Sequence, residues 1–121
     1  MSQMRTLPEM TAAVRETNIA LGWRSDQTTF GEYIALLHSE LSEALEAYRD
    51  WRLTDATHIN GIGPTPKPEG VGSELADVLI RLLDTCDVYG IDLEAEFARK
   101  VAYNRTRPYQ HGGRTLSGDK P

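Results

Sequence analysis

Apolar side chains recur with helical spacing over residues 73–90, and they cover more of the helix than one core contact needs. At about 100° per residue the apolar arc spans roughly 200° of the circumference; its members are Leu75, Ala76, Val78, Leu79, Ile80, Leu82, Leu83 and Cys86. A surface helix normally buries a narrower stripe. The pattern therefore predicts a helix buried on most sides, with surface left over for a second subunit.

Two further helices are predicted before this one. The first begins near Pro8, a residue suited to the first helical turn, and ends near Gly22. The second begins at Thr29, whose hydroxyl can cap the helix while Glu32 reaches back, and it continues to about Trp51.

The remaining segments complete an all-α fold. Ser73 is the predicted cap of the apolar helix, and a fourth helix follows Asp92 and ends near residue 107. Glycine and proline are frequent between residues 53 and 72, which predicts a loop without strands. We expect a four-helix bundle in one domain, 1–113, with a Gly/Pro-rich loop insert at 60–72 and a polar tail at 114–121.

Composition excludes several classes of protein. The 121 residues include 13 Lys+Arg and 18 Asp+Glu, a formal net charge of −5, whereas nucleic-acid-binding surfaces are usually basic. One cysteine rules out an internal disulfide, and no apolar run is long enough to span a membrane. We expect a cytoplasmic protein that binds neither nucleic acid nor membrane.

Carboxylates of the second helix point toward its apolar side. With Leu36 set to 0°, Glu40 lies at about 40°, inside the apolar arc, and Glu43 lies at its edge. Glu46 points away. Because a buried carboxylate without a partner is costly, Glu40 and Glu43 are predicted to have a cationic partner.

The third helix has a matching polar strip, which contains Glu74, Asp77, Arg81 and Asp84. Glu-x-x-Glu on one helix facing Glu-x-x-Asp on an antiparallel neighbour forms a cup of four carboxylates. Mg²⁺ prefers such oxygen ligands together with water and substrate phosphates. The alternative is that Arg81 neutralises Asp77 or Glu74 in a structural ion pair. A di-iron site is excluded because it requires inward Glu-x-x-His pairs, which the three histidines do not supply.

The fourth helix places Lys100, Asn104 and Arg107 along one line beside its apolar stripe. An ammonium and a guanidinium can hold phosphate oxygens, and an amide can bind a sugar hydroxyl or a base edge. The alternative is a basic helix end that complements the helix dipole.

Three stretches in this order resemble the MazG-like branch of the all-α nucleoside triphosphate pyrophosphohydrolases: LLHSELSEALEAYRDWR (36–52), SELADVLIRLLDTCDVYGIDL (73–93) and KVAYNRTRPYQHGG (100–113). That family carries E-x-x-E, then E-x-x-D, then a lysine, an asparagine and an arginine. The matching residues here are Glu40, Glu43, Glu74, Asp77, Lys100, Asn104 and Arg107. The 30 residues between Glu43 and Glu74 make a longer connector than the family pattern.

The resemblance implies hydrolysis of a (d)NTP to the monophosphate and pyrophosphate in nucleotide-pool control, with Mg²⁺ as cofactor or Mn²⁺ in its place. It implies that Glu40, Glu43, Glu74 and Asp77 hold the metal, that one of the glutamates is the base, and that Lys100 and Arg107 bind phosphates while Asn104 binds sugar or phosphate. It also points to a homodimer or homotetramer, and to a bacterium or a phage-infected cell as the setting. A nucleotide sensor or interaction module that binds Mg²⁺-nucleotide without turnover would carry the same ligands.

Trp23 has two interpretations. It is a candidate for stacking on a nucleobase, which is worth about 1–3 kcal/mol, and equally a candidate core residue. The room that a tryptophan platform offers favours a purine substrate such as dGTP.

Overall fold

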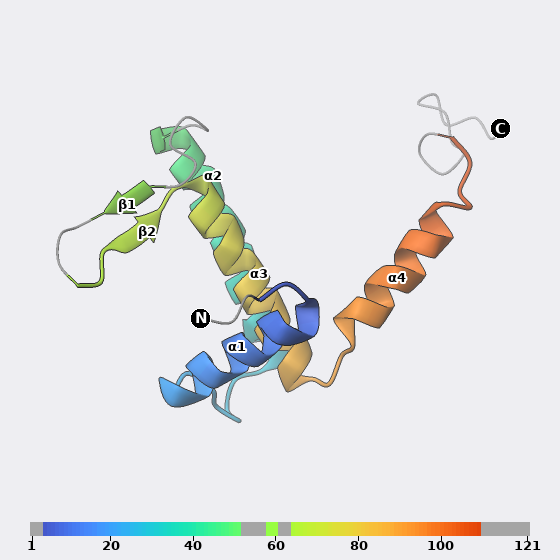
Figure 1. Ribbon diagram of the computed structural model, residues 1–121, viewed down its shortest axis with the longest axis horizontal. Helices are drawn as coiled ribbons and strands as arrows, with labels where there is room; N and C mark the ends of the chain where they lie inside the picture. Colours follow the sequence, from blue (N-terminus) through green and yellow to red (C-terminus); the bar gives the residue numbers. More distant parts are fainter. Residues whose placement is uncertain (1–3, 52–57, 61–63, 110–121) are drawn as a thin grey trace. The chain divides into compact units, whose positions relative to one another are not determined.

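The structure is a computed structural model that describes residues 4–51, 58–60 and 64–109. Figure 1 shows four helices and one two-stranded antiparallel sheet. In chain order these are α1 (Leu7–Ala20), α2 (Phe30–Trp51), β1 (His58–Asn60), β2 (Lys67–Glu69), α3 (Val71–Val88) and α4 (Leu93–Asn104). Among the described residues the fold is almost entirely helical, as the sequence predicts, and no helix there is both long and apolar enough to cross a membrane.

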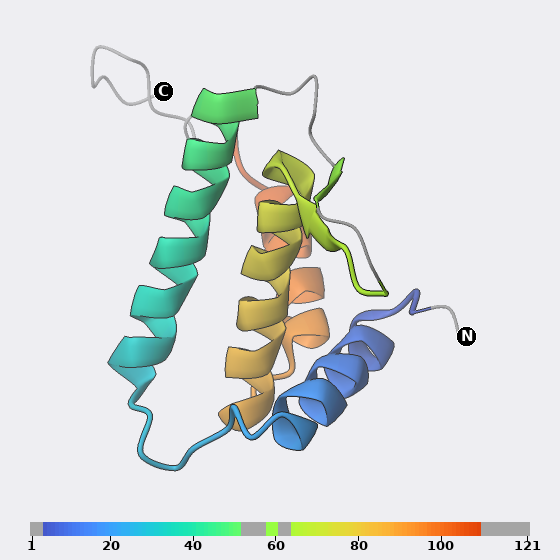
Figure 2. The same cartoon turned by 90° about the vertical axis from the view of Figure 1, so that its left-hand side faces the viewer.

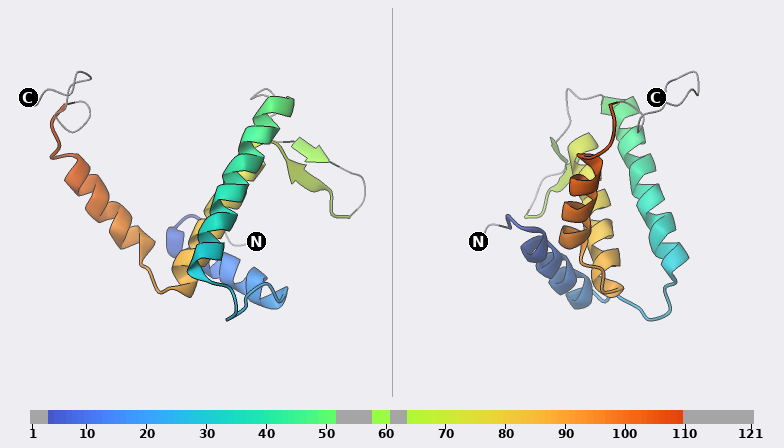
Figure 3. Two further views of the ribbon diagram at one scale, coloured as in Figure 1. Left: turned by 180° about the vertical axis from the view of Figure 1, so that it is seen from behind. Right: turned by 90° about the vertical axis from the view of Figure 1, so that its right-hand side faces the viewer.

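The chain divides into two units, residues 1–91 and 92–121, which are described separately. In the first unit α3 packs against both α2 and α1. Figure 2 shows α2 and α3 side by side, and Figure 3 shows α1 near the C-terminal end of α3. The buried apolar side chains are Val14, Tyr33, Ala44, Leu83 and Cys86, of which Leu83 is the most buried at 2% exposure.

Aromatic rings fix α2 and α3 in an antiparallel arrangement. Tyr89, just after α3, meets both Phe30 and Tyr33 of α2 edge to face, at ring-centroid distances of 5.1 and 5.7 Å. Farther along, Arg81 of α3 bonds Glu40 of α2. Because residue numbers fall on one helix as they rise on the other, the middle of α2 lies opposite the N-terminal half of α3.

The predicted helix starts are confirmed for α1 and α2 to within a residue or so. Thr6 caps α1 by accepting a bond from the Glu9 backbone N–H, with Pro8 in the first turn. The Thr29 hydroxyl accepts from the Glu32 backbone N–H at 3.2 Å, as the capping motif predicts.

The prediction of a loop without strands over residues 53–72 is wrong. This segment contains both β1 and β2, which pair in the register His58↔Glu69. These strands have three residues each, too short for an alternating pattern to appear in the sequence. The helix α3 starts at Val71 after Gly70, so Ser73 lies inside it and its hydroxyl donates to the Pro68 carbonyl instead of capping. Residues 53–57 and 61–63 of the predicted loop and the whole predicted tail, 114–121, lie outside the described residues.

An ion network joins α1, the α1–α2 connection and the last turn of α3. Arg15 of α1 donates from Nε to Asp87 at 2.9 Å. Arg24 donates to Asp87 at 2.7 Å and to Asp84 at 2.8 Å. The hydrogen bond from Arg15, followed by that from Arg24, lowers the pKa of Asp87 to about 2.

This network gives the first prediction. Because the folded pKa of Asp87 lies below its ordinary value, its stabilisation is present above about pH 4 and is lost as the pH falls toward 2. Asp87→Asn is therefore expected to lower the free energy of unfolding by about 1–2 kcal/mol at pH 7. Urea unfolding at pH 7 and pH 2.5 measures the difference, and an equal loss at both pH values would contradict it.

The second unit contains α4. Asp92 caps it by accepting from the Ala95 backbone N–H at 3.0 Å, as predicted. The helix ends at Asn104, three residues before the predicted end. None of its residues is buried, and Phe97 on its apolar stripe is 65% exposed.

Candidate metal centre

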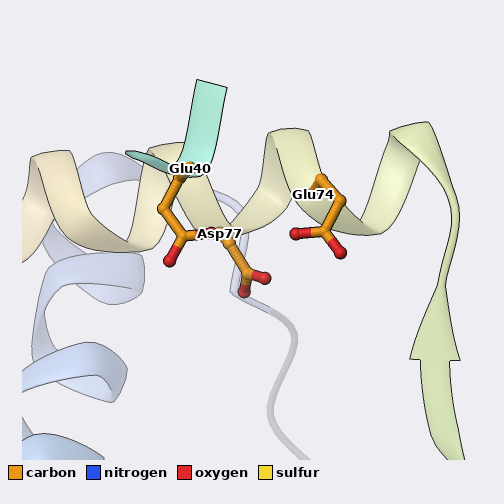
Figure 4. Close-up of side chains that lie close together, drawn as sticks. All are labelled: Glu40, Glu74 and Asp77. Carbon is orange, nitrogen blue, oxygen red and sulfur yellow. The ribbon is translucent and has the colours of Figure 1, made fainter. Parts of the chain in front are cut away.

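Three of the predicted metal ligands lie together between α2 and α3. Glu74 and Asp77 are one helical turn apart on α3, so they share a face. Glu40 comes from the middle of α2, which the antiparallel packing places opposite them (Figure 4). One ligand oxygen from each residue lies within 4.8 Å of the other two. We name these three residues the carboxylate cluster.

The cluster is half-buried, and its electrostatics are unfavourable without a cation. Burial raises the pKa of Glu74, and the negative charges of Asp77, Glu40 and Glu43 raise it further. Burial also raises the pKa of Asp77, followed by the charge of Glu40. Both carboxyl groups are therefore harder to ionise in the metal-free fold than in water.

Arg81 is the cation nearest to the cluster. Its Nε donates to Glu40 Oε1 at 2.7 Å, so the ion pair that the sequence suggested for Asp77 or Glu74 is made with Glu40. The positive charges of Arg81 and Lys67 both oppose the rise in the pKa of Asp77. Two cations against three carboxylates still leave the cluster with excess negative charge.

The donor set fits a hard divalent cation. All three groups offer carboxylate oxygens, two helices supply them, and burial restricts the number of competing waters. Mg²⁺ and Mn²⁺ are held in such sites by a few carboxylates, and the remaining positions are open to water or substrate phosphates.

Glu43, the fourth predicted ligand, is exposed and lies outside the cluster. It is still close enough for its charge to raise the pKa of Glu74. Its place one turn after Glu40 puts it at the solvent-facing edge of the cluster. Glu46 is 59% exposed and pairs with Arg49 at 3.3 Å, as its outward angle predicts.

The phosphate-binding candidates Lys100, Asn104 and Arg107 all belong to the second unit and are exposed. Lys100 Nζ lies 5.7 Å from the centroid of the Tyr103 ring. The helix-dipole alternative has little support, because α4 has no basic residue in its last turn.

Trp23 is 69% exposed, which argues against a role as a core residue. Gly22, with φ 73°, ends the turn after α1, and the Trp23 backbone N–H then bonds the Asn18 carbonyl at 2.9 Å. Trp23 lines a cavity of about 340 Å³ whose other walls include Asn18, Thr28, Tyr33, Arg81 and Asp84. We name it the Trp23 cavity.

Sequence reasoning missed two residues of this cavity. Asn18 is buried beside the core, and the available signal was its place four residues after Val14 on the same face of α1. Asp84 is part of the polar strip predicted on the third helix, and no buried ion pair is predicted for it. Instead its side chain is 14% exposed and accepts two hydrogen bonds from Arg24, a residue far away in the sequence.

The Trp23 cavity adjoins the carboxylate cluster. Arg81 belongs to the wall of the cavity and also bonds Glu40. Asp84 and Asp77 are two helical turns apart on α3, about 10 Å along its axis. Comparison of the chain with models of protein families, with curated proteins and with solved structures finds no match.

Proposed function

We propose that this protein is a Mg²⁺-dependent nucleoside triphosphate pyrophosphohydrolase with a MazG-like fold. It hydrolyses a (d)NTP to the (d)NMP and pyrophosphate. The observation that carries the proposal is the meeting of Glu40, Glu74 and Asp77, because these positions belong to the two acidic motifs that the resemblance rests on.

Each group has a role in this reaction. Glu40, Glu74 and Asp77 would hold the cation, which would neutralise phosphate charge and lower the pKa of water. A glutamate carboxylate accepts the proton of the attacking water, and both Glu40 and the exposed Glu43 are candidates for this base. The new bond forms between the water oxygen and the α-phosphorus, and the bond to the bridging oxygen breaks to release pyrophosphate.

The proposed phosphate-binding groups are Lys100, Asn104 and Arg107. Lys100 and Arg107 are assigned to the departing pyrophosphate, whose developing charge they would stabilise, and Asn104 is assigned to sugar or phosphate. All three are exposed, so their side chains are open to a ligand.

The Trp23 cavity supports a nucleotide as substrate. An exposed indole offers a flat face for a base, and Arg81, which lines the same cavity, bonds Glu40 of the carboxylate cluster. Its volume of about 340 Å³ is in the usual range for small-molecule sites and suits a purine such as that of dGTP.

A homodimer or homotetramer is part of the proposal. Leu75, Leu79 and Ile80 on the wide apolar arc of α3 are 50%, 38% and 42% exposed. A second subunit that covers them would remove apolar surface from water. Residues of that subunit are then available to complete the site.

A product assay tests the proposed reaction. The protein is incubated with Mg²⁺ and each of the eight common ribo- and deoxyribonucleoside triphosphates, and the products are separated by ion exchange. Monophosphate with pyrophosphate is the expected pair. Diphosphate with phosphate would contradict the cleavage position, and binding without turnover would favour a nucleotide sensor.

A further inference from the structure

The Trp23 cavity contains a buried side-chain amide that makes no hydrogen bond with the part of the chain that the structure describes. Asn18 is 8% exposed, and among residues 4–51, 58–60 and 64–109 no group makes a hydrogen bond to its side chain. Its polar atoms are not sealed from the surface, and the residue lines the cavity. Because burying an amide without a hydrogen-bond partner costs free energy, this position suits a ligand with a polar edge.

Asp84 adds a free acceptor to the same wall. Both hydrogen bonds from Arg24 end on its Oδ1, at 3.0 and 2.8 Å. Within the described part of the chain, Oδ2 accepts no hydrogen bond. The carboxylate is thus fixed in place by Arg24 and still has an oxygen available to a ligand.

Arg81 adds free donors. Only its Nε is used, in the bond to Glu40, and the described residues take no hydrogen bond from its two terminal nitrogens. The cavity therefore combines an aromatic face at Trp23 with three kinds of polar group. These are a carboxylate acceptor, a guanidinium donor and an amide that has both a hydrogen-bond donor and an acceptor.

We infer that the Trp23 cavity selects guanine, with Asp84 as the main specificity-determining residue. This inference rests on the proposed function, since it assumes that the ligand is a nucleotide. Among the common bases, guanine alone presents two neighbouring N–H donors, N1–H and the 2-amino group, which the two lone pairs of the free Oδ2 of Asp84 can accept together. Its O6 and N7 acceptors suit Arg81 and Asn18.

The other bases fit this wall less well. Adenine has an acceptor nitrogen beside its amino group, so a carboxylate that accepts from the amino group meets a lone pair. Cytosine has the same neighbouring acceptor, and thymine has a single N–H between two carbonyl oxygens. Selection therefore depends on the negative charge of Asp84, while stacking on Trp23 binds every base.

Calorimetric titration of the full chain with deoxynucleoside monophosphates tests the inference without hydrolysis. In the presence of Mg²⁺, dGMP is expected to bind about tenfold or more tightly than dAMP, since hydrogen bonds to a charged acceptor change affinity at this level. The probe dIMP, which lacks the 2-amino group, is expected to lie between them. Equal affinities, or no binding of dGMP, would overturn the inference.

Two matched variants assign the effect to Asp84. Asp84→Asn removes the carboxylate, and we expect it to weaken dGMP binding about tenfold with little change for dAMP. Asp87→Asn also breaks a bond to Arg24, but Asp87 is not part of the Trp23 cavity, so this control keeps the preference for dGMP. An equal loss of preference in both variants would mean that Asp84 acts only by holding Arg24.

The result is separable from the proposed reaction. Selective binding of dGMP by a protein that hydrolyses no triphosphate would support guanine selection and contradict the enzyme. Hydrolysis of all triphosphates at similar rates, with equal binding of dGMP and dAMP, would support the enzyme and overturn guanine selection.

Discussion

Glu74→Gln is expected to lower the rate of pyrophosphate release by about a hundredfold or more, because metal ions supply several kcal/mol of charge stabilisation in such reactions. The same change is expected to leave the metal-free fold at least as stable as the wild type. Burial and three neighbouring carboxylates raise the pKa of Glu74, so its ionised form is unfavourable in the fold.

The sign of the pH dependence follows from this shift. A folded pKa above the ordinary value of 4.5 means that the metal-free fold binds the Glu74 proton more tightly than the unfolded chain does. Stability from this group is therefore present at low pH and is lost as the pH rises through the raised pKa. Glu74→Gln removes this loss of stability with rising pH. Thermal unfolding of both proteins with a chelator between pH 4 and 7 measures the difference in their pH dependence.

Glu46→Gln is the matched control for Glu74→Gln. Glu46 is on α2, is 59% exposed and pairs only with Arg49 among the described residues. The rate of pyrophosphate release by Glu46→Gln is therefore expected to match that of the wild type. Hydrolysis by Glu74→Gln within about threefold of the control would contradict a metal-binding role. Loss of activity together with loss of helicity would instead indicate a structural role.

Lys100→Ala is expected to weaken binding of a nucleoside triphosphate about tenfold to a hundredfold, the range for a lost charge-assisted hydrogen bond. Monophosphate binding should fall much less, because Lys100 is assigned to the pyrophosphate part. Calorimetry with dGMP and with a triphosphate whose α,β bridge resists hydrolysis measures both.

Arg99 offers the control for Lys100. It lies next to Lys100 on α4, and its guanidinium already pairs with Glu96 at 2.6 Å. Arg99→Ala removes the same formal charge and is expected to change triphosphate binding little. Equal losses for the monophosphate and the triphosphate in Lys100→Ala would contradict the assignment.

Helical periodicity predicts most of this fold, and capping side chains mark the starts of α1, α2 and α4. Thr29 and Asp92 cap the helices that follow them, as their side chains predict. The β-hairpin is not visible in the sequence, because its strands are held by main-chain pairing over three residues each. The start of α3 is missed for a related reason, since Gly70 at its cap has φ 105° and no side chain to reveal it.

The candidate site is predictable in part. The direction of Glu40 toward the apolar arc and the turn-spaced Glu74 and Asp77 bring these three groups together once α2 and α3 pack. The partner of Arg81 depends on which residues face each other across that contact, which the angles of separate helices do not give. The meeting of Asn18 and Asp84 with Trp23 in one cavity also depends on contacts between elements. The turn at Gly22 precedes Trp23, and Arg24 bonds Asp84 of α3.

Titration of the metal-free protein with Mn²⁺, followed by the electron paramagnetic resonance signal of free Mn²⁺, tests the central claim most directly. The claim is that carboxylates of α2 and α3 form a cation site. We expect the wild type and Glu46→Gln to remove Mn²⁺ from solution with equal affinity, and added Mg²⁺ to release it. We expect Glu74→Gln to bind at least about tenfold more weakly. Mn²⁺ binding that is absent from the wild type, or unchanged in Glu74→Gln, would contradict the account.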